Sequence, residues 1–149
     1  MRLTYLCDIE LTFEDDPVLV RPFGGEEGTA FGQGEGTVSG ERVRGTVRWS
    51  NHAHRRSDGA MLPDLRGVIA TEDGATILFA QQGRTVWSET PEGRVGSQLL
   101  WVLFETEDAR YRWLNDAFCV QEGKVAFPIA RGRGHLGSAR IYECVNELL

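Results

Sequence analysis

The segment RWSNHAHRRSDG, residues 48–59, gathers two of the chain's three histidines, three arginines, a tryptophan and an aspartate. On an extended strand His52 and His54 would share one face about 7 Å apart, and both could reach one metal ion, with His135 as a third ligand. This spacing imitates a cupin metal motif but departs from it at several positions, so metal ligation is the alternative hypothesis. We expect instead a loop over the mouth of a pocket, where His52 or His54 guards the rim as a second acid–base group.

Polar side chains interrupt three segments that otherwise have the apolar character of buried strands. Asp64 and Arg66 occur in LPDLRGVIA, Gln81 in TILFAQQ, and Asn115 in WLNDAFC. If these side chains point into a barrel, they form a polar patch within an apolar cavity, which is the usual design of a small-molecule site. Strand alternation by itself does not choose the face, so an ion pair of Asp64 with Arg66 on the outer surface is the alternative.

These residue types indicate acid–base chemistry. Asp64 would move a proton, Arg66 would stabilise a developing oxyanion, and Gln81 and Asn115 would orient the substrate. The predicted catalytic residues are Asp64, Arg66 and His54, and the predicted substrate-binding residues are Trp49, His52, Gln81, Trp101, Trp113 and Asn115.

Three further patterns point to weaker sites. GRGHLG, residues 132–137, matches the GxGxxG spacing of dinucleotide-binding loops, but only twelve residues follow and they read as a strand, so we expect a glycine-rich hairpin loop. Cys119 lies in an apolar segment and is expected to fill core space rather than act as a nucleophile. Five arginines could hold one anionic group of a small ligand, although alternating charges usually mark a solvated face. They are Arg42, Arg44, Arg48, Arg55 and Arg56.

The composition limits the partners. The chain has 149 residues, 16 Lys+Arg and 22 Asp+Glu, and its net charge of −6 disfavours polyphosphates and anionic membranes. We therefore expect no nucleic-acid partner and no membrane partner. Three widely spaced cysteines without a CxxC motif argue against a disulfide framework, and the N-terminal segment MRLTYLCDIELTF alternates instead of forming the apolar run of a secretory signal. These features predict a cytoplasmic protein.

Apolar and polar residues alternate along most of the chain, and glycine-rich segments separate the alternating stretches, which predicts an all-β chain. Leu3, Tyr5, Cys7, Ile9 and Leu11 are expected to line one face of a first strand. The sequence around Asp73 and Gly74 predicts a hairpin turn, and TEDARYRWLN predicts one short helical turn that Thr106 could cap. We predict a single domain over residues 1–149. Its fold is a closed antiparallel up-and-down barrel of about eight or nine strands, with a sandwich as the alternative.

Several stretches together resemble one family. GTVRWSN, RSDGAMLPDLRGVIATEDGATILFAQQGRT, FETEDARYRWLNDAFCV and ARIYECV are similar to the family of domain of unknown function 3237, also called UPF 0311. The chain departs from the family pattern in SNHAHRR and in carrying Gln81 where many relatives have asparagine. The resemblance implies a β-barrel of the calycin or allene oxide cyclase type with an internal cavity, and a homodimer as a candidate assembly.

Three functions remain open at this stage. The first is cofactor-free acid–base catalysis on a small aromatic or carbonyl compound, as a lyase, isomerase, cyclase or dehydratase. The second is a ligand carrier that uses the same cavity without turnover. The third is an interaction module whose sheet edge or tryptophan-bearing face dimerises. For the first two we expect a small-molecule ligand, no cofactor and no metal.

Overall fold

The computed structural model describes residues 1–91, 93–127 and 135–149. Within them nearly every segment is an antiparallel strand, because apolar and polar residues alternate along the chain. The strands are β1 (Arg2–Phe13), β2 (Val18–Val20), β3 (Gly28–Ser39), β4 (Arg44–Arg55), β5 (Met61–Leu62), β6 (Asp64–Thr71), β7 (Thr76–Thr90), β8 (Gly93–Glu105), β9 (Cys119–Phe127) and β10 (His135–Val145). One short 3₁₀ helix, η1 (Ala109–Asn115), connects β8 to β9.

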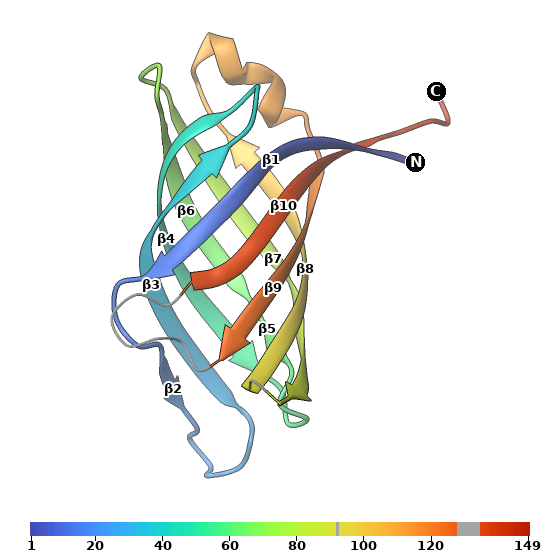
Figure 1. Cartoon of the computed structure of the whole chain (residues 1–149). Helices are drawn as coiled ribbons and strands as arrows, with labels where there is room; N and C mark the ends of the chain where they lie inside the picture. Colours follow the sequence, from blue (N-terminus) through green and yellow to red (C-terminus); the bar gives the residue numbers. More distant parts are fainter. Residues whose placement is uncertain (92, 128–134) are drawn as a thin grey trace.

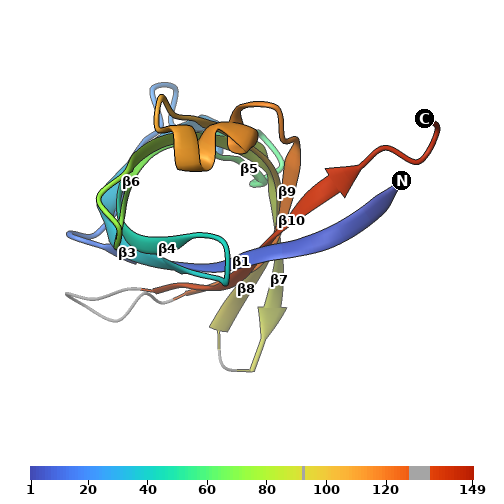
Figure 2. The ribbon, with the colours of Figure 1, turned by 90° about the horizontal axis from the view of Figure 1, so that it is seen from above.

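The eight longer strands close into a ring, which Figure 2 shows end on. Around the wall they follow the order β1-β3-β4-β6-β7-β8-β9-β10, and β10 pairs with β1. The short strand β2 extends the sheet beside β3, and β5 pairs with both β4 and β7. The predicted closed, up-and-down antiparallel barrel is confirmed, and the two short strands raise the count in the described chain to ten.

The wall of the barrel is amphipathic. In β8 the side chains of Gln98, Leu100, Val102 and Phe104 are buried, and most of the residues between them are exposed. Inward-facing side chains from all eight long strands meet as one apolar core. The free energy that stabilises the barrel therefore comes mainly from apolar surface removed from water inside the ring.

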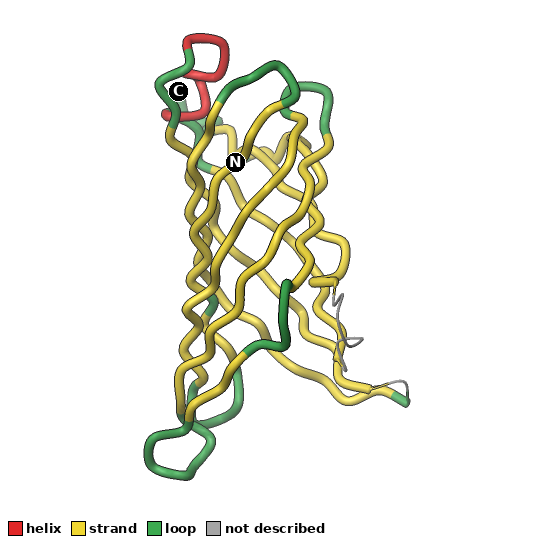
Figure 3. Tube along the Cα trace, turned by 90° about the vertical axis from the view of Figure 1, so that its left-hand side faces the viewer, coloured by secondary structure: helices red, strands yellow, loops and turns green. Residues whose placement is uncertain are grey.

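One end of the barrel is closed by η1, which lies at the top of Figures 1 and 3. Leu114 of this helix is 0% exposed and points into the barrel end. The Tyr111 hydroxyl, also from η1, donates to Asp73 Oδ2 at 2.7 Å and connects the helix to the β6–β7 turn. That turn is the predicted hairpin, with Gly74 at a φ of 89°. The predicted helical turn is confirmed, but its N-cap is Asp108 and not Thr106.

The opposite end is flanked by two extended segments, β2 with the start of β3, and the β7–β8 hairpin, at the bottom of Figure 1. Side chains cover this end less completely, so it is where the interior is accessible. No helix in the described ranges has the length and apolar character needed to span a membrane.

Candidate ligand-binding site

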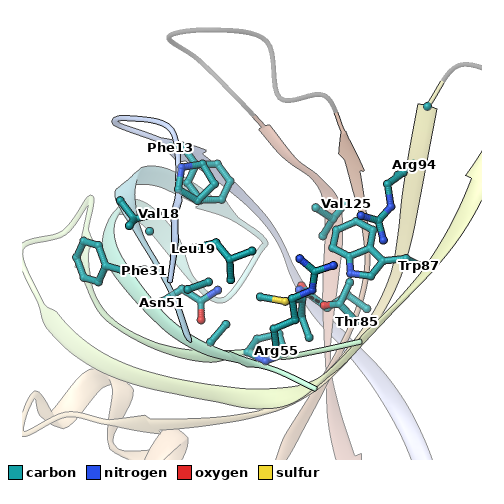
Figure 4. Close-up of a pocket in the computed structure, with 18 of the residues that line it drawn as sticks. Phe13, Val18, Leu19, Phe31, Asn51, Arg55, Thr85, Trp87, Arg94 and Val125 are labelled. Atoms are coloured by element: carbon teal, nitrogen blue, oxygen red, sulfur yellow. Dashed lines mark hydrogen bonds between the residues drawn. The ribbon is translucent and has the colours of Figure 1, made fainter. Parts of the chain in front are cut away.

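A pocket of about 590 Å³ opens at the end of the barrel opposite η1. Figure 4 shows that its walls come from β2 and β3 on one side and from β7, β8 and β9 on the other. Most of its lining is apolar, as is usual for a cavity that holds a small organic molecule. The apolar lining includes Phe13, Val18, Leu19, Phe31, Met61, Trp87 and Val125.

Arg55 is the charged group inside this pocket. It is the last residue of β4, and its side chain is only 17% exposed. Nη2 of the guanidinium donates to the carboxylate of Glu26, which precedes β3 and is half exposed. Nε of Arg55 is buried and has no hydrogen-bond partner among the described residues. The pocket lining therefore contains a cation that is only partly paired, because one buried donor of the guanidinium has no partner in the described part of the chain.

A chain of buried amides descends from the core to the pocket. Gln81 Nε2 donates to Gln121 Oε1 at 2.7 Å, Gln121 Nε2 donates to Gln98 Oε1 at 3.4 Å, and Gln98 Nε2 donates to Thr85 Oγ1 at 3.0 Å. All four side chains are buried, and Gln98 and Thr85 line the pocket. Inside an apolar barrel these bonds satisfy most of the amide groups that would otherwise lose their hydration, although Gln81 Oε1 is buried without a partner among the described residues.

The rim of the pocket is polar. Arg94 Nε lies 3.1 Å from Glu89 Oε1, and the Arg94 guanidinium lies 5.1 Å from the Trp87 ring centroid. Both charged side chains reach solvent, and they neutralise each other. Apolar walls, a buried cation at the base and a polar rim together make this pocket suited to an amphipathic small molecule.

The geometry of the barrel agrees with the comparisons. The family model described as protein of unknown function DUF3237 matches residues 1–128 of the chain. The chain belongs to this family. No curated protein matches it.

Solved structures share the DUF3237 chain's fold at low sequence identity. A protein of unknown function from Clostridium acetobutylicum superposes with a TM-score of 0.78 at 20% identity, and covers 96% of each chain. A β-barrel-like protein from Acinetobacter baumannii gives 0.75 at 20% identity, and an enzyme from Penicillium herquei gives 0.71 at 21%, each covering 95% of this chain and 92% of its own. At these identities the likeness shows the fold alone.

The expectation that Asp64 and Arg66 face the cavity of this DUF3237 protein is wrong. Their side chains lie on the outer face of β6, 39% and 63% exposed, with Arg66 Nε 3.3 Å from Asp64 Oδ1. Asp64 also accepts a hydrogen bond from Gln82, which is its partner in the neighbouring strand. The structure therefore has the outer ion pair that was the alternative, and a catalytic role for the two residues loses its structural basis.

The predicted loop over the pocket mouth is also wrong, because residues 50–55 continue β4 as regular strand. His52 and His54 lie on its outer face, where His52 contacts the Phe31 ring edge-on and His54 Nε2 lies 3.3 Å from Glu27. His135 belongs to β10, three strands away around the wall, and its side chain is outside the described residues. Among the described residues no metal-binding group of three is found.

The other predicted binding residues separate into an inner and an outer set. Gln81 points inward as expected, at 0% exposure, and Trp49 points inward but packs in the core, where Nε1 donates to the Glu35 carbonyl. Trp101 lies on the outer face of β8. The remaining pair is at the closed end: Trp113 lies under the Arg42 guanidinium at 3.6 Å, and Asn115 exchanges hydrogen bonds with the Thr106 backbone.

Sequence reasoning missed Asn51, Thr85 and Gln98 as pocket residues, and it named Arg55 only as one of five arginines that could hold an anionic group. A signal for two of them was present, because Asn51 and Arg55 continue the inward face that Val47 and Trp49 begin. That signal required β4 to extend through Arg55. The five arginines named from the sequence are dispersed, and of these five only Arg55 lines the pocket. The predicted GRGHLG loop lies largely outside the described residues.

The cysteines give a direct test of core placement. Burial raises the pKa of both Cys7 and Cys119 to about 12, so at pH 8 both thiols are protonated and unreactive, whereas Cys144 is half-buried. We expect a thiol-specific disulfide reagent to modify Cys144 in native protein and all three thiols in concentrated guanidinium chloride. A native Cys144→Ser variant that still reacts rapidly would contradict the placement of Cys7 and Cys119.

Proposed function

We propose that this protein binds a small, largely apolar molecule in the pocket at the open end of the barrel. The observation that carries the proposal is the pocket itself, about 590 Å³ in volume, with apolar walls around the buried guanidinium of Arg55. Cavities of this size and character are typical of small-ligand sites. The closed end, filled by Leu114 and Tyr111, leaves the described interior accessible from one side.

Turnover in the same pocket is the second candidate. Arg55 could stabilise negative charge that develops on a bound substrate, and one structural neighbour is described as an enzyme. The chemistry would then be isomerisation, cyclisation, dehydration or lysis, without Asp64 or His54 as proton carrier, because both lie outside the cavity. A ligand carrier is favoured over an enzyme because the described pocket lining has one carboxylate, Glu89, and that group is paired with Arg94.

Blocking the pocket from one strand tests the proposal. Ala30 lines the pocket, and the residue before it on β3, Thr29, is exposed on the opposite face. We expect Ala30→Trp to weaken binding of the neutral fluorophore N-phenyl-α-naphthylamine at least about tenfold, because the indole fills space that the probe needs. Fluorescence titration of both variants measures the two dissociation constants.

Thr29→Trp is the matched control, since it adds the same side chain to the same strand outside the cavity. Its affinity for the fluorophore should equal that of the unmodified chain. Equal affinity of the Ala30→Trp variant, or no binding by the unmodified chain, would refute the pocket as the ligand site. The homodimer, the cytoplasmic location and the absence of nucleic-acid, membrane and cofactor partners stay predictions.

A further inference from the structure

The strand register places the polar groups of the pocket in one row. Arg55 of β4 pairs with Met61 of β5, Met61 pairs with Thr85 of β7, and Thr85 pairs with Gln98 of β8. All four residues line the pocket, and Figure 4 shows Arg55 rising from the base of the pocket on the side of Thr85. Directly paired residues share a sheet face, so the side chains of Arg55 and Thr85 leave the inner wall at the same level.

The hydrogen bonds made within this row leave donors available. The oxygen of Gln98 already accepts from Gln121, and Thr85 Oγ1 already accepts from Gln98. The Thr85 hydroxyl proton has no acceptor among the described residues, and a guanidinium can only donate. A ligand group that contacts the Arg55 guanidinium must therefore be an acceptor, and the Thr85 hydroxyl can donate to the same group.

The charge of Arg55 is only partly compensated. Glu26 accepts from Nη2, but its carboxylate is 52% exposed, and Nε is buried without a hydrogen-bond partner among the described residues. Water screens the half of this pair that reaches solvent, so the interior side of the guanidinium keeps a positive potential. An anionic acceptor therefore binds the Arg55 guanidinium more strongly than a neutral one, since charge-assisted hydrogen bonds are the stronger kind.

We infer that the ligand of this pocket carries an oxyanion, either a carboxylate or a deprotonated phenol or enol, that binds the Arg55 guanidinium and the Thr85 hydroxyl. Its apolar body would lie against the walls that include Leu19 and Trp87. The inference rests on the proposed function, because it names the chemical class of ligand for the same site.

A pair of isosteric probes tests the inference. α-Naphthoate and α-naphthamide have the same aromatic body, and only the first is anionic at neutral pH. Each is titrated against protein loaded with N-phenyl-α-naphthylamine, and the displaced fluorescence gives its dissociation constant. We expect naphthoate to bind at least about tenfold more tightly than naphthamide, which is the difference expected for one charge-assisted hydrogen bond.

Two variants of β4 test whether Arg55 causes the preference for naphthoate over naphthamide. Arg55→Gln should reduce the ratio of the two dissociation constants to near one, because it weakens binding of naphthoate much more than binding of naphthamide. Arg48→Gln removes the same charge from the outer face of the same strand and should keep the ratio of the unmodified chain. Circular dichroism of each variant checks that the barrel is intact.

Glu26 and Glu27 give a second, independent measurement that needs no change inside the pocket. Glu26→Gln removes the carboxylate that competes for Arg55, so naphthoate should bind several-fold more tightly, while naphthamide should not. Glu27→Gln is the control, because Glu27 is exposed and contacts His54 on the outer face.

Equal displacement by the two probes, or no displacement by naphthoate while the neutral fluorophore still binds, would overturn the inference and leave the proposed pocket standing. If Arg55→Gln fails to fold, an unchanged naphthoate affinity in Glu26→Gln overturns it. Failure of the fluorophore itself to bind overturns the proposed function together with the inference.

Discussion

Substituting Gly34 by alanine should lower the free energy of unfolding by more than about 3 kcal/mol, at the upper end of the cost of overpacking. Gly34 lies on the inward face of β3, where an added Cβ would come within 1.8 Å of the Thr12 carbonyl oxygen on β1. The obstacle is backbone of the paired strand, so it cannot move aside like the tip of a flexible side chain. Without side chains at Gly34 and Gly36, β3 can follow the tight curvature of the barrel against β1.

Urea denaturation followed by tryptophan fluorescence measures this loss as a lower midpoint at constant slope. Gly25→Ala is the matched control, because a Cβ at Gly25 has no neighbouring atom within 4 Å. Its stability should change by less than about 0.5 kcal/mol, as for other surface substitutions. A Gly34→Ala variant with the stability of the control would show that the two strands are not in contact there.

Substituting Leu114 by alanine should cost about 2–5 kcal/mol, the range for truncating a fully buried leucine. Leu114 is 0% exposed and belongs to η1, the helix that closes one end of the barrel. Its side chain fills the space at that end, and truncation leaves a cavity between the helix and the core. Thermal or urea unfolding of the variant measures the loss.

The same variant separates the closed end from the ligand site. Since the pocket is at the opposite end, the Leu114→Ala variant at a temperature where it is folded should bind N-phenyl-α-naphthylamine with unchanged affinity. Arg112→Ala, on the exposed side of η1, is the control and should change stability by less than about 0.5 kcal/mol. Loss of fluorophore binding in the folded Leu114→Ala variant would contradict the location of the ligand site at the end of the barrel opposite η1.

Local sequence patterns predicted the elements well where one signal dominated. The Asp73–Gly74 turn formed where expected, because a glycine with positive φ closes the hairpin at low cost. The first strand formed as well, but a register shift between Tyr5 and Cys7 turned Leu3 and Tyr5 outward and buried Leu6 beside Cys7. Such a bulge has no local signature in an alternating segment, because it is set by pairing with β10.

The orientation of β6 shows the limit of the pattern. Asp64, Arg66 and Val68 alternate with Leu65, Gly67 and Ile69, so each face of the strand contains at least one branched apolar residue. Pairing decides between them: Leu65 is opposite Gln81, and Asp64 is opposite Gln82. Once Gln81 is inward, Asp64 and Arg66 must be outward.

The sequence by itself determined the class of fold, the approximate strands, the helical turn and the inward position of Gln81, because these depend on local alternation and turn chemistry. The tertiary structure alone decided which end of the barrel is open and that Arg55, Thr85 and Gln98 line one pocket. A period of two is unchanged when a strand is turned over, so only closure of the ring and the register between neighbours give each strand an inside and an outside.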